Sequence, residues 1–284
     1  MLTYAECPRD AWQGLDRVIP TAEKVAYLQA LLDAGFRYLD MGSFVSKKAV
    51  PQLADTEEVL AQLEPPTGAE LLCIIANERG LTRALQAENV TRVGYPFSVN
   101  DTFQRRNTKR AVADSWPLIK EMLAGASEAG LGLVVYLSMG FGNPYGEPWE
   151  PADTAHIAER LRELGVDKLV LADTVGTATP EILAEVLAAV GEPERLGLHL
   201  HARPDDWQAK VRAGLDAGVR WLEGAMGGLG GCPFAGNALV GNLPTEELLP
   251  FLAERFEVDS RVLAALPELQ RRSVAVSESV GSGQ

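Results

Sequence analysis

Two of the three histidines in the chain stand one residue apart, in the segment Leu196–His201 with the sequence LGLHLH. On a β-strand, His199 and His201 would project to the same face, because strand side chains alternate with a period of two. Two convergent imidazoles beside a carboxylate form a metal-ligand set, and completion by oxygen ligands favours an octahedral divalent cation. Two histidines that are simply hydrogen-bonded in a polar pocket are the alternative, but the scarcity of histidine favours a metal site. The third, His156, falls in a helical pattern and is expected on the surface.

A cation and an anion, Arg9 and Asp10, follow the apolar run Leu2–Cys7. At the end of a buried strand such a pair costs free energy unless each charge has a partner. A metal ion for Asp10 and an anionic or enolate oxygen for Arg9 would provide those partners. A mutual ion pair on the surface is the alternative, although adjacent side chains pair with poor geometry.

A third candidate segment, residues 227–242 (GGLGGCPFAGNALVGN), surrounds Cys232 with glycines. Glycine permits tight turns and close approach of the backbone to a ligand, as in loops that close over a substrate. A thiol in such a loop is a candidate acid–base group or nucleophile. A plain flexible connection is the alternative.

Short apolar segments alternate with helical patterns along almost the whole chain. At Gly35, Gly130, Gly165 and Gly218 a helical pattern ends in glycine and a strand pattern follows, which is typical of repeated βα units with parallel strands. Eight strands with intervening helices indicate an α/β fold, a (β/α)8 TIM barrel with extra C-terminal helices. The expected strands are Leu2–Cys7, Tyr38–Met41, Glu70–Ala76, Thr91–Phe97, Gly132–Ser138, Lys168–Ala172, Leu196–His201 and Arg220–Gly224.

We predict a single catalytic domain over residues 1–272 and a flexible tail, rich in Ser and Gly, over residues 273–284. The active site of such a barrel lies at the C-terminal ends of its strands. The expected helices include Thr21–Ala34, Asp55–Leu63, Asp114–Ala129, Asp153–Leu164, Thr179–Val190, Thr245–Arg255 and Ser260–Leu269.

The length of 284 residues suits one barrel, and the net charge of −13 argues against nucleic-acid and membrane partners. This net charge does not argue against a small anionic substrate, because a binding site can carry local positive charge. Three distant cysteines exclude a disulfide framework, and no apolar stretch approaches the roughly 18 residues of a membrane span. The N-terminus lacks the features of a secretory signal, so we expect a cytoplasmic protein. The late helices are compatible with a homodimer.

Five collinear segments resemble 3-hydroxy-3-methylglutaryl-CoA lyases. Pro8-Arg9-Asp10 with Gln13 resembles the family's PRDGLQ opening, and His199-Leu-His201 resembles its HxH motif. The other three segments are 43–52 (SFVSKKAVPQ, similar to SFVSPKxVPQ), 173–180 (DTVGTATP, similar to DTxGxxTP) and 228–246, which resembles the signature loop. The chain departs from the family pattern at Asp40, where Glu is common, and at Ala202, where Asp is common.

The resemblance implies a TIM barrel with a divalent cation, Mg²⁺ or Mn²⁺. The metal ligands that it implies are Asp10, His199, His201 and Asn242. It further implies that Arg9 stabilises a thioester enolate, that Cys232 is the catalytic loop thiol, and that Asp173 and Asp40 join the same polar network. We expect His199 or Asp10 to act as the base. The expected substrate contacts are Arg9, Gln13, Ser43, Phe44 and Tyr136.

We therefore predict a metal-dependent carbon–carbon lyase that cleaves a 3-hydroxy-3-methylglutaryl-CoA-like thioester to acetyl-CoA and a keto acid, acetoacetate. The basic residues of the segment 105–110 and the pair Lys47 and Lys48 are candidates for contacting CoA phosphates, with solvated surface positions as the alternative. A related metal-dependent aldolase or Claisen-condensing enzyme, acting on another hydroxy or keto acid or acyl-CoA, is a second hypothesis. A barrel without catalytic activity is a third.

Overall fold

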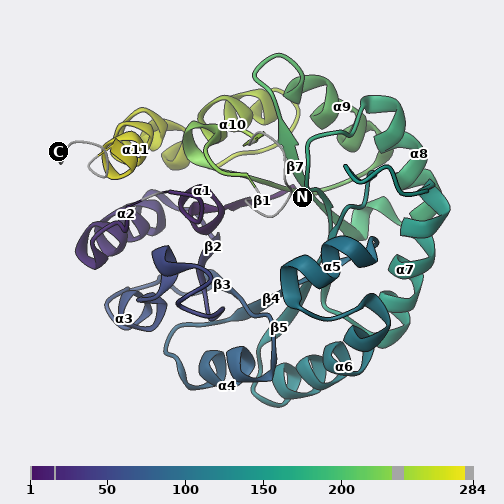
Figure 1. Ribbon diagram of the computed structural model, residues 1–284. Coiled ribbons are helices and arrows are strands. Elements are labelled where there is room, and N and C mark those ends of the chain that lie inside the picture. Colours follow the sequence, from purple (N-terminus) through teal and green to yellow (C-terminus); the bar gives the residue numbers. More distant parts are fainter. Residues whose placement is uncertain (1, 16, 232–239, 279–284) are drawn as a thin grey trace.

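Eight strands, β1 to β8, hydrogen-bond to their neighbours in parallel and in chain order, and β8 pairs with β1, so the sheet closes into a barrel (Figure 1). The computed structural model describes residues 2–15, 17–231 and 240–278. The strands are β1 (Thr3–Glu6), β2 (Tyr38–Ser43), β3 (Glu70–Ile74), β4 (Arg92–Ser98), β5 (Gly132–Ser138), β6 (Lys168–Asp173), β7 (Leu196–Ala202) and β8 (Trp221–Gly224). The predicted (β/α)8 barrel is confirmed, and every predicted strand end lies within two residues of the observed one.

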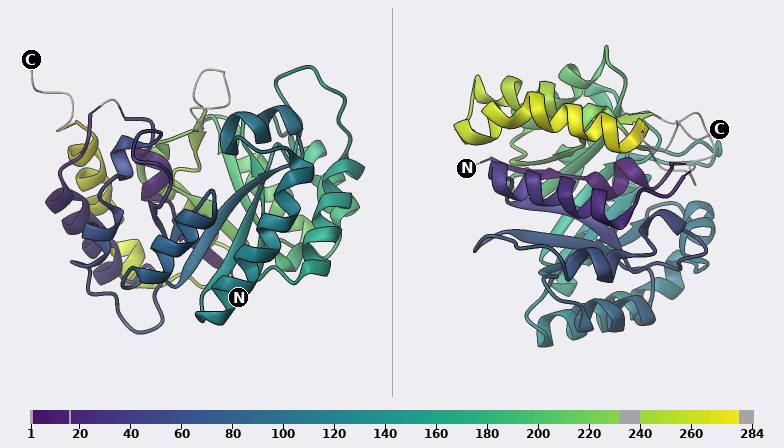
Figure 2. Two further views of the ribbon diagram at one scale, coloured as in Figure 1. Left: turned by 60° about the horizontal axis from the view of Figure 1, so that its bottom comes forward. Right: turned by 90° about the vertical axis from the view of Figure 1, so that its left-hand side faces the viewer.

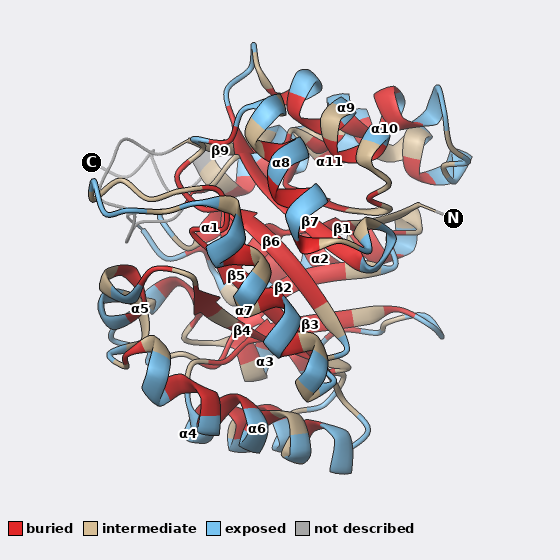
Figure 3. Cartoon of the chain, turned by 90° about the vertical axis from the view of Figure 1, so that its right-hand side faces the viewer, coloured by how far each residue is buried: buried red, intermediate tan, exposed pale blue. Residues whose placement is uncertain are grey.

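Helices cover the outside of the barrel, and their outward faces are exposed while the strands are buried (Figure 3). Gly35, Gly165 and Gly218 end three of these helices at positive φ angles of 107°, 81° and 112°, the left-handed conformation that glycine adopts without a steric penalty. The helices are α1 (Pro8–Trp12), α2 (Thr21–Ala34), α3 (Thr56–Leu60), α4 (Glu78–Gln86), α5 (Asp101–Thr108), α6 (Val112–Glu128), α7 (Pro151–Leu164), α8 (Pro180–Val190), α9 (Trp207–Ala217), α10 (Thr245–Ala253) and α11 (Ser260–Glu278).

The C-terminal helix is longer than the sequence pattern suggested. Residues 273–278, which we predicted to be part of a flexible tail, continue α11, and Ser273 is buried. The reason is an apolar stripe, Val262, Leu266, Leu269 and Val276, whose helical spacing continues past Ser273 and is buried. α11 packs beside α2 and so connects the end of the chain to the beginning of the barrel (Figure 2). Residues 279–284 lie outside the described part of the chain.

Two short elements were absent from the prediction and matter for the site. The five-residue helix α1 follows β1 and carries Arg9 and Asp10. Strand β9 (Gly241–Asn242) pairs antiparallel with β7, which places Asn242 opposite His201. Among the described residues, no helix is both long and apolar enough to cross a membrane.

Candidate active site

A cavity of about 140 Å³ opens among the C-terminal ends of the strands. Seven residues that the sequence singled out line it together: Arg9, Asp10, Gln13, Ser43, Tyr136, His199 and His201. The remaining lining is largely apolar. The connection after β2, with β3, β4 and α5, contributes Val45, Ala49, Val50, Leu53, Ile74, Pro96 and Phe103. One side of the cavity is therefore charged and the other is suited to hydrocarbon groups.

Asp10, His199 and His201 point their donor atoms at one another. The two Nε2 atoms lie 3.3 Å apart, and Oδ2 of Asp10 lies 4.0 Å from Nε2 of His199 and 3.8 Å from Nε2 of His201. All three side chains are buried. The histidines share one face of β7, as their spacing predicted, and α1 brings the carboxylate to the same point.

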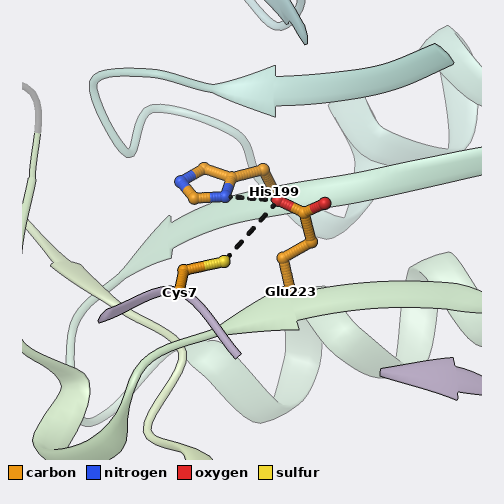
Figure 4. A group of neighbouring side chains, drawn as sticks. All are labelled: Cys7, His199 and Glu223. Atoms are coloured by element: carbon orange, nitrogen blue, oxygen red, sulfur yellow. Dashed lines mark hydrogen bonds and ion pairs between the residues drawn. The ribbon is translucent and has the colours of Figure 1, made fainter. Parts of the chain in front are cut away.

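The opposite nitrogen of each imidazole has an oxygen partner. His199 Nδ1 lies 2.9 Å from a carboxylate oxygen of Glu223, which Cys7 Sγ also contacts at 3.9 Å (Figure 4). His201 Nδ1 lies 3.1 Å from the carbonyl oxygen of Thr174. Because both oxygens are acceptors, the neutral rings carry their protons on Nδ1 and present lone pairs from Nε2. Histidines that ligate metals are held in this way, by a second hydrogen bond from the nitrogen that faces away from the ion.

The electrostatics of the pocket favour positive charge between the two rings. Burial alone would raise the pKa of Asp10, but Arg9, His201 and His199 hold it well below its ordinary value. Burial alone would lower the pKa of His199, but the hydrogen bond to Glu223 and the charge of Asp10 raise it above its ordinary value. An ionised carboxylate and two convergent imidazoles are the ligands that a divalent cation requires.

Asn242 lies beside these three side chains. Its Nδ2 donates to Oδ2 of Asp10 and to the carbonyl of Leu229, both at 2.7 Å. Its Oδ1 is buried and has no hydrogen-bond partner among the described residues, which is costly unless a ligand takes that oxygen. Gly230 makes the close packing feasible, because a Cβ there would lie 2.5 Å from Nδ2 of Asn242. The residues present therefore fit a divalent cation with mixed nitrogen and oxygen ligands.

Arg9 is held from three sides. Its guanidinium pairs with Asp40 through Nε and Nη2, while Nη1 donates to Oδ1 of Asp10 and to Oε1 of Gln13, both at 3.0 Å. Within the described part of the chain these contacts use four of the five N–H groups of an arginine. The remaining one, on Nη2, has no partner among the described residues, and Arg9 lines the cavity. Asp40 itself is fully buried behind Arg9, so it orients the guanidinium.

Asp173 does not line the cavity but forms a buried ion pair with Lys210, at 3.2 Å. Its Oδ1 accepts hydrogen bonds from the backbone of Thr177 and Ala178 and so fixes the turn after β6. Lys210 also donates to the carbonyl of His201, at 2.9 Å. The same turn supplies the Thr174 carbonyl that orients His201, so Asp173 acts on this histidine through the backbone.

Other sequence candidates lie away from the donor set. Phe44 is buried under the guanidinium of Arg83 and does not line the cavity. Arg105 and Arg110 pair with Asp101 and Glu78 on the surface, although Asn107 of the same segment lines the cavity, as does Phe103 earlier in α5. Lys47, Lys48 and His156 are exposed. Cys232 lies outside the described residues.

Sequence reasoning missed the roles of Glu223 and Lys210. Glu223 gave one usable signal, because an acidic residue near the end of an apolar strand is expected to have a partner. Lys210 gave no signal, since a lysine in a polar helical pattern is ordinarily exposed.

A sequence profile of the HMGL-like family matches residues 4–266. The hydroxymethylglutaryl-CoA lyase of Pseudomonas mevalonii is 33% identical over 86% of this chain and 82% of that enzyme. The 3-hydroxy-3-isohexenylglutaryl-CoA/hydroxy-methylglutaryl-CoA lyase of Pseudomonas aeruginosa is 31% identical over 95% of this chain and 90% of that enzyme. The structure of an HMG-CoA lyase from Acinetobacter baumannii, in complex with coenzyme A and 3-methylmalate, is 31% identical, with a TM-score of 0.88 over 98% of this chain and 91% of that one.

Proposed function

Because the chain belongs to the HMGL-like family of carbon–carbon lyases, we propose that it cleaves 3-hydroxy-3-methylglutaryl-CoA to acetyl-CoA and acetoacetate. The observation that carries this proposal is the convergence of Asp10, His199 and His201 in the same cavity as Arg9. Retro-aldol cleavage of such a substrate needs a group that binds its hydroxyl and carboxylate oxygens and a cation for the enolate oxygen that develops. The charged side of the cavity offers both.

The family depends on a divalent metal ion, and this donor set fits one. We assign Asp10, His199, His201 and the free oxygen of Asn242 as its ligands, with Mg²⁺ or Mn²⁺ as the ion. When bound, the ion would supply Lewis-acid polarisation of the substrate's hydroxyl and carboxylate oxygens.

Arg9 stabilises the enolate of the acetyl-CoA product through its free Nη2 hydrogen. The guanidinium is already fixed by Asp40, Asp10 and Gln13, so no reorganisation is needed when negative charge develops on the thioester oxygen. The apolar wall of the cavity, together with Tyr136 and Ser43, then confines the carbon skeleton.

Proton transfer completes the reaction. The substrate hydroxyl loses its proton to a base, the C2–C3 bond breaks, C3 becomes the ketone of acetoacetate, and C2 of the enolate takes up a proton. The base is one of the two residues expected from the sequence, His199 or Asp10, which both line the cavity. We assign protonation of C2 to the Cys232 thiol.

A second candidate is the same cleavage of a thioester with a longer branch at C3. The apolar wall of Val45, Ala49, Val50 and Leu53 suits a hydrocarbon branch, and one relative is named for an isohexenyl substrate. The reaction chemistry is unchanged, and only the contacts with the branch differ.

The test is release of acetyl-CoA from 3-hydroxy-3-methylglutaryl-CoA by the protein supplied with Mg²⁺ or Mn²⁺, with a 3-isohexenyl analogue assayed in parallel. We expect cleavage that stops on chelation and returns with added metal. Faster cleavage of the analogue would favour the second candidate. Absence of cleavage of both thioesters with either metal would contradict the proposed function.

A further inference from the structure

Glu6 is a buried acid at the end of β1 that no step of the proposed reaction uses. Its Oε1 accepts a hydrogen bond from the backbone N–H of Met226, at 2.8 Å. Its Oε2 contacts the hydroxyl of Thr245, at 2.5 Å, and the hydroxyl of Tyr4, at 3.0 Å. Met226 precedes and Thr245 follows the glycine-rich segment 227–241, so Glu6 ties both ends of that segment to β1.

Three oxygen atoms form a closed triangle at this point. Tyr4 and Thr245 contact each other as well, with 2.6 Å between their hydroxyl oxygens. Each of the three oxygen–oxygen contacts needs one proton to be a hydrogen bond. Tyr4 and Thr245 supply one proton each, and a protonated carboxyl group of Glu6 supplies the third. With an ionised Glu6, only two protons would serve the three contacts, so one proton would have to be shared.

The surroundings agree with an uncharged Glu6. The titratable groups that face it are Tyr4 on β1, Tyr27 on α2 and Glu246 on α10, with Cys7 next along the chain, and none of these is a cation. Burial raises the pKa of Glu6 to about 7, although Thr245, Met226 and Tyr4 oppose the shift.

We infer that Glu6 is held as a neutral carboxylic acid, closes a ring of hydrogen bonds with Tyr4 and Thr245, and thereby positions the two ends of the glycine-rich segment. Those ends are linked to each other by Ala225, which donates to the carbonyl of Leu243 at 3.0 Å and accepts from Thr245 at 3.3 Å. Asn242 lies within this junction and also donates to Leu229. Glu6 is thus a positioning residue for Asn242. The positioning of Asn242 as a metal ligand rests on the proposed function, whereas the protonation of Glu6 does not.

Infrared spectroscopy tests the protonation directly. The difference spectrum between the wild-type protein and Glu6→Gln should show the C=O stretch of a carboxylic acid at pH 6, replaced by carboxylate bands at pH 8.5. Glu128→Gln, which changes an exposed glutamate on α6, is the matched control and should show no carboxylic-acid band at pH 6. A wild-type spectrum without that band at pH 6 would overturn the inference.

The pH dependence of unfolding gives a second readout. A carboxyl group with a raised pKa in the folded state stabilises it at low pH, and that stability is lost as pH rises towards the folded-state pKa. Relative to Glu6→Gln, the unfolding equilibrium constant of the wild-type protein should rise up to about tenfold per pH unit between about pH 5 and pH 7, then level off. Parallel curves for the two proteins would overturn the inference.

Binding of Mn²⁺, followed by electron paramagnetic resonance, tests the positioning role. Tyr4→Phe and Thr245→Val each remove one hydroxyl from the ring and should weaken Mn²⁺ binding several-fold, whereas Glu6→Gln, which can still donate and accept, should retain it. Unchanged affinity in both hydroxyl variants would overturn the positioning role. If the thioester is not cleaved but the carboxylic-acid band is present, the proposed function fails while the protonation of Glu6 stands.

Discussion

Nε2 of His199 lies 3.3 Å from Nε2 of His201. Each Nδ1 faces an oxygen acceptor and carries the ring proton, so neither Nε2 has a proton when the rings are neutral. Two facing lone pairs repel unless a cation lies at that point or one ring is protonated. Glu223 and the Thr174 carbonyl therefore do more than satisfy buried nitrogens. They hold both rings in the tautomer that is protonated on Nδ1. This tautomer is unfavourable when the two Nε2 atoms face each other alone, and it is favourable when both bind one cation.

Removal of either histidine should abolish tight binding of a divalent cation. We expect His199→Ala and His201→Ala to lose Mn²⁺ binding measured by calorimetry, and to lose the thermal stabilisation that Mn²⁺ gives the wild-type protein. At one hundred times its dissociation constant, a ligand of the native state adds about 2.7 kcal/mol to stability. His156→Ala is the matched control, because His156 is exposed, and Mn²⁺ should stabilise this variant as it does the wild type. Binding that survives in both cavity variants would place the cation elsewhere.

Glu223→Gln should weaken metal binding without removing a ligand. The carboxylate accepts from His199, and its other oxygen accepts from Trp221 at 3.0 Å and from Tyr136 at 3.3 Å. A neutral amide keeps the shape but loses the charge that supports His199 as a donor, and changes of this kind typically cost about 10- to 100-fold in metal affinity. The Mn²⁺ dissociation constant of the variant checks this. A dissociation constant equal to that of the wild type would show that Glu223 serves only packing.

The buried ion pair between Asp173 and Lys210 should contribute to the free energy of unfolding through the interaction of the two side chains. Lys210→Met leaves Asp173 buried without its cation, which typically costs about 3–5 kcal/mol in the free energy of unfolding. Asp173→Asn in the Lys210→Met background removes the unpaired charge and should recover part of that loss. Urea denaturation of the two single variants and the double variant measures the coupling. Additive effects would mean that the two side chains act independently.

The sequence predicted the barrel and the histidine pair because both depend on local patterns. Glycine after a helix and alternation along a strand are properties of a few adjacent residues, so Gly35 or the pair His199 and His201 can be interpreted without the fold. Lys210 is different, because its burial depends on where α9 packs against β7 and on the turn that Asp173 fixes.

Asn242 illustrates the same limit in the site. Its role was implied by resemblance to a family, and nothing in its neighbourhood predicted the two-residue strand that pairs with β7. The extent of α11 was missed for another reason. The Ser- and Gly-rich composition at the end of the chain predicts a tail, but the apolar period that continues to Val276 extends the helix.

Gly230→Ala should disrupt the metal site more than its small size suggests. A Cβ at this position would lie 2.5 Å from Nδ2 of Asn242 and 3.0 Å from Oδ2 of Asp10, and the backbone φ of +108° is itself unfavourable for alanine. Asn242 and Asp10 would have to move apart, so we expect Mn²⁺ affinity to fall at least tenfold.

Gly68→Ala is the matched control for this substitution. Gly68 also has a positive φ, of +81°, but no atom of the described residues lies within 4 Å of the position that a Cβ would take there. This variant should lose about 1–2 kcal/mol of stability through backbone strain alone and keep the wild-type Mn²⁺ affinity. If both variants bind Mn²⁺ equally well, Asn242 and Asp10 tolerate a shift at Gly230, and the close packing of this glycine has no part in forming the cation site.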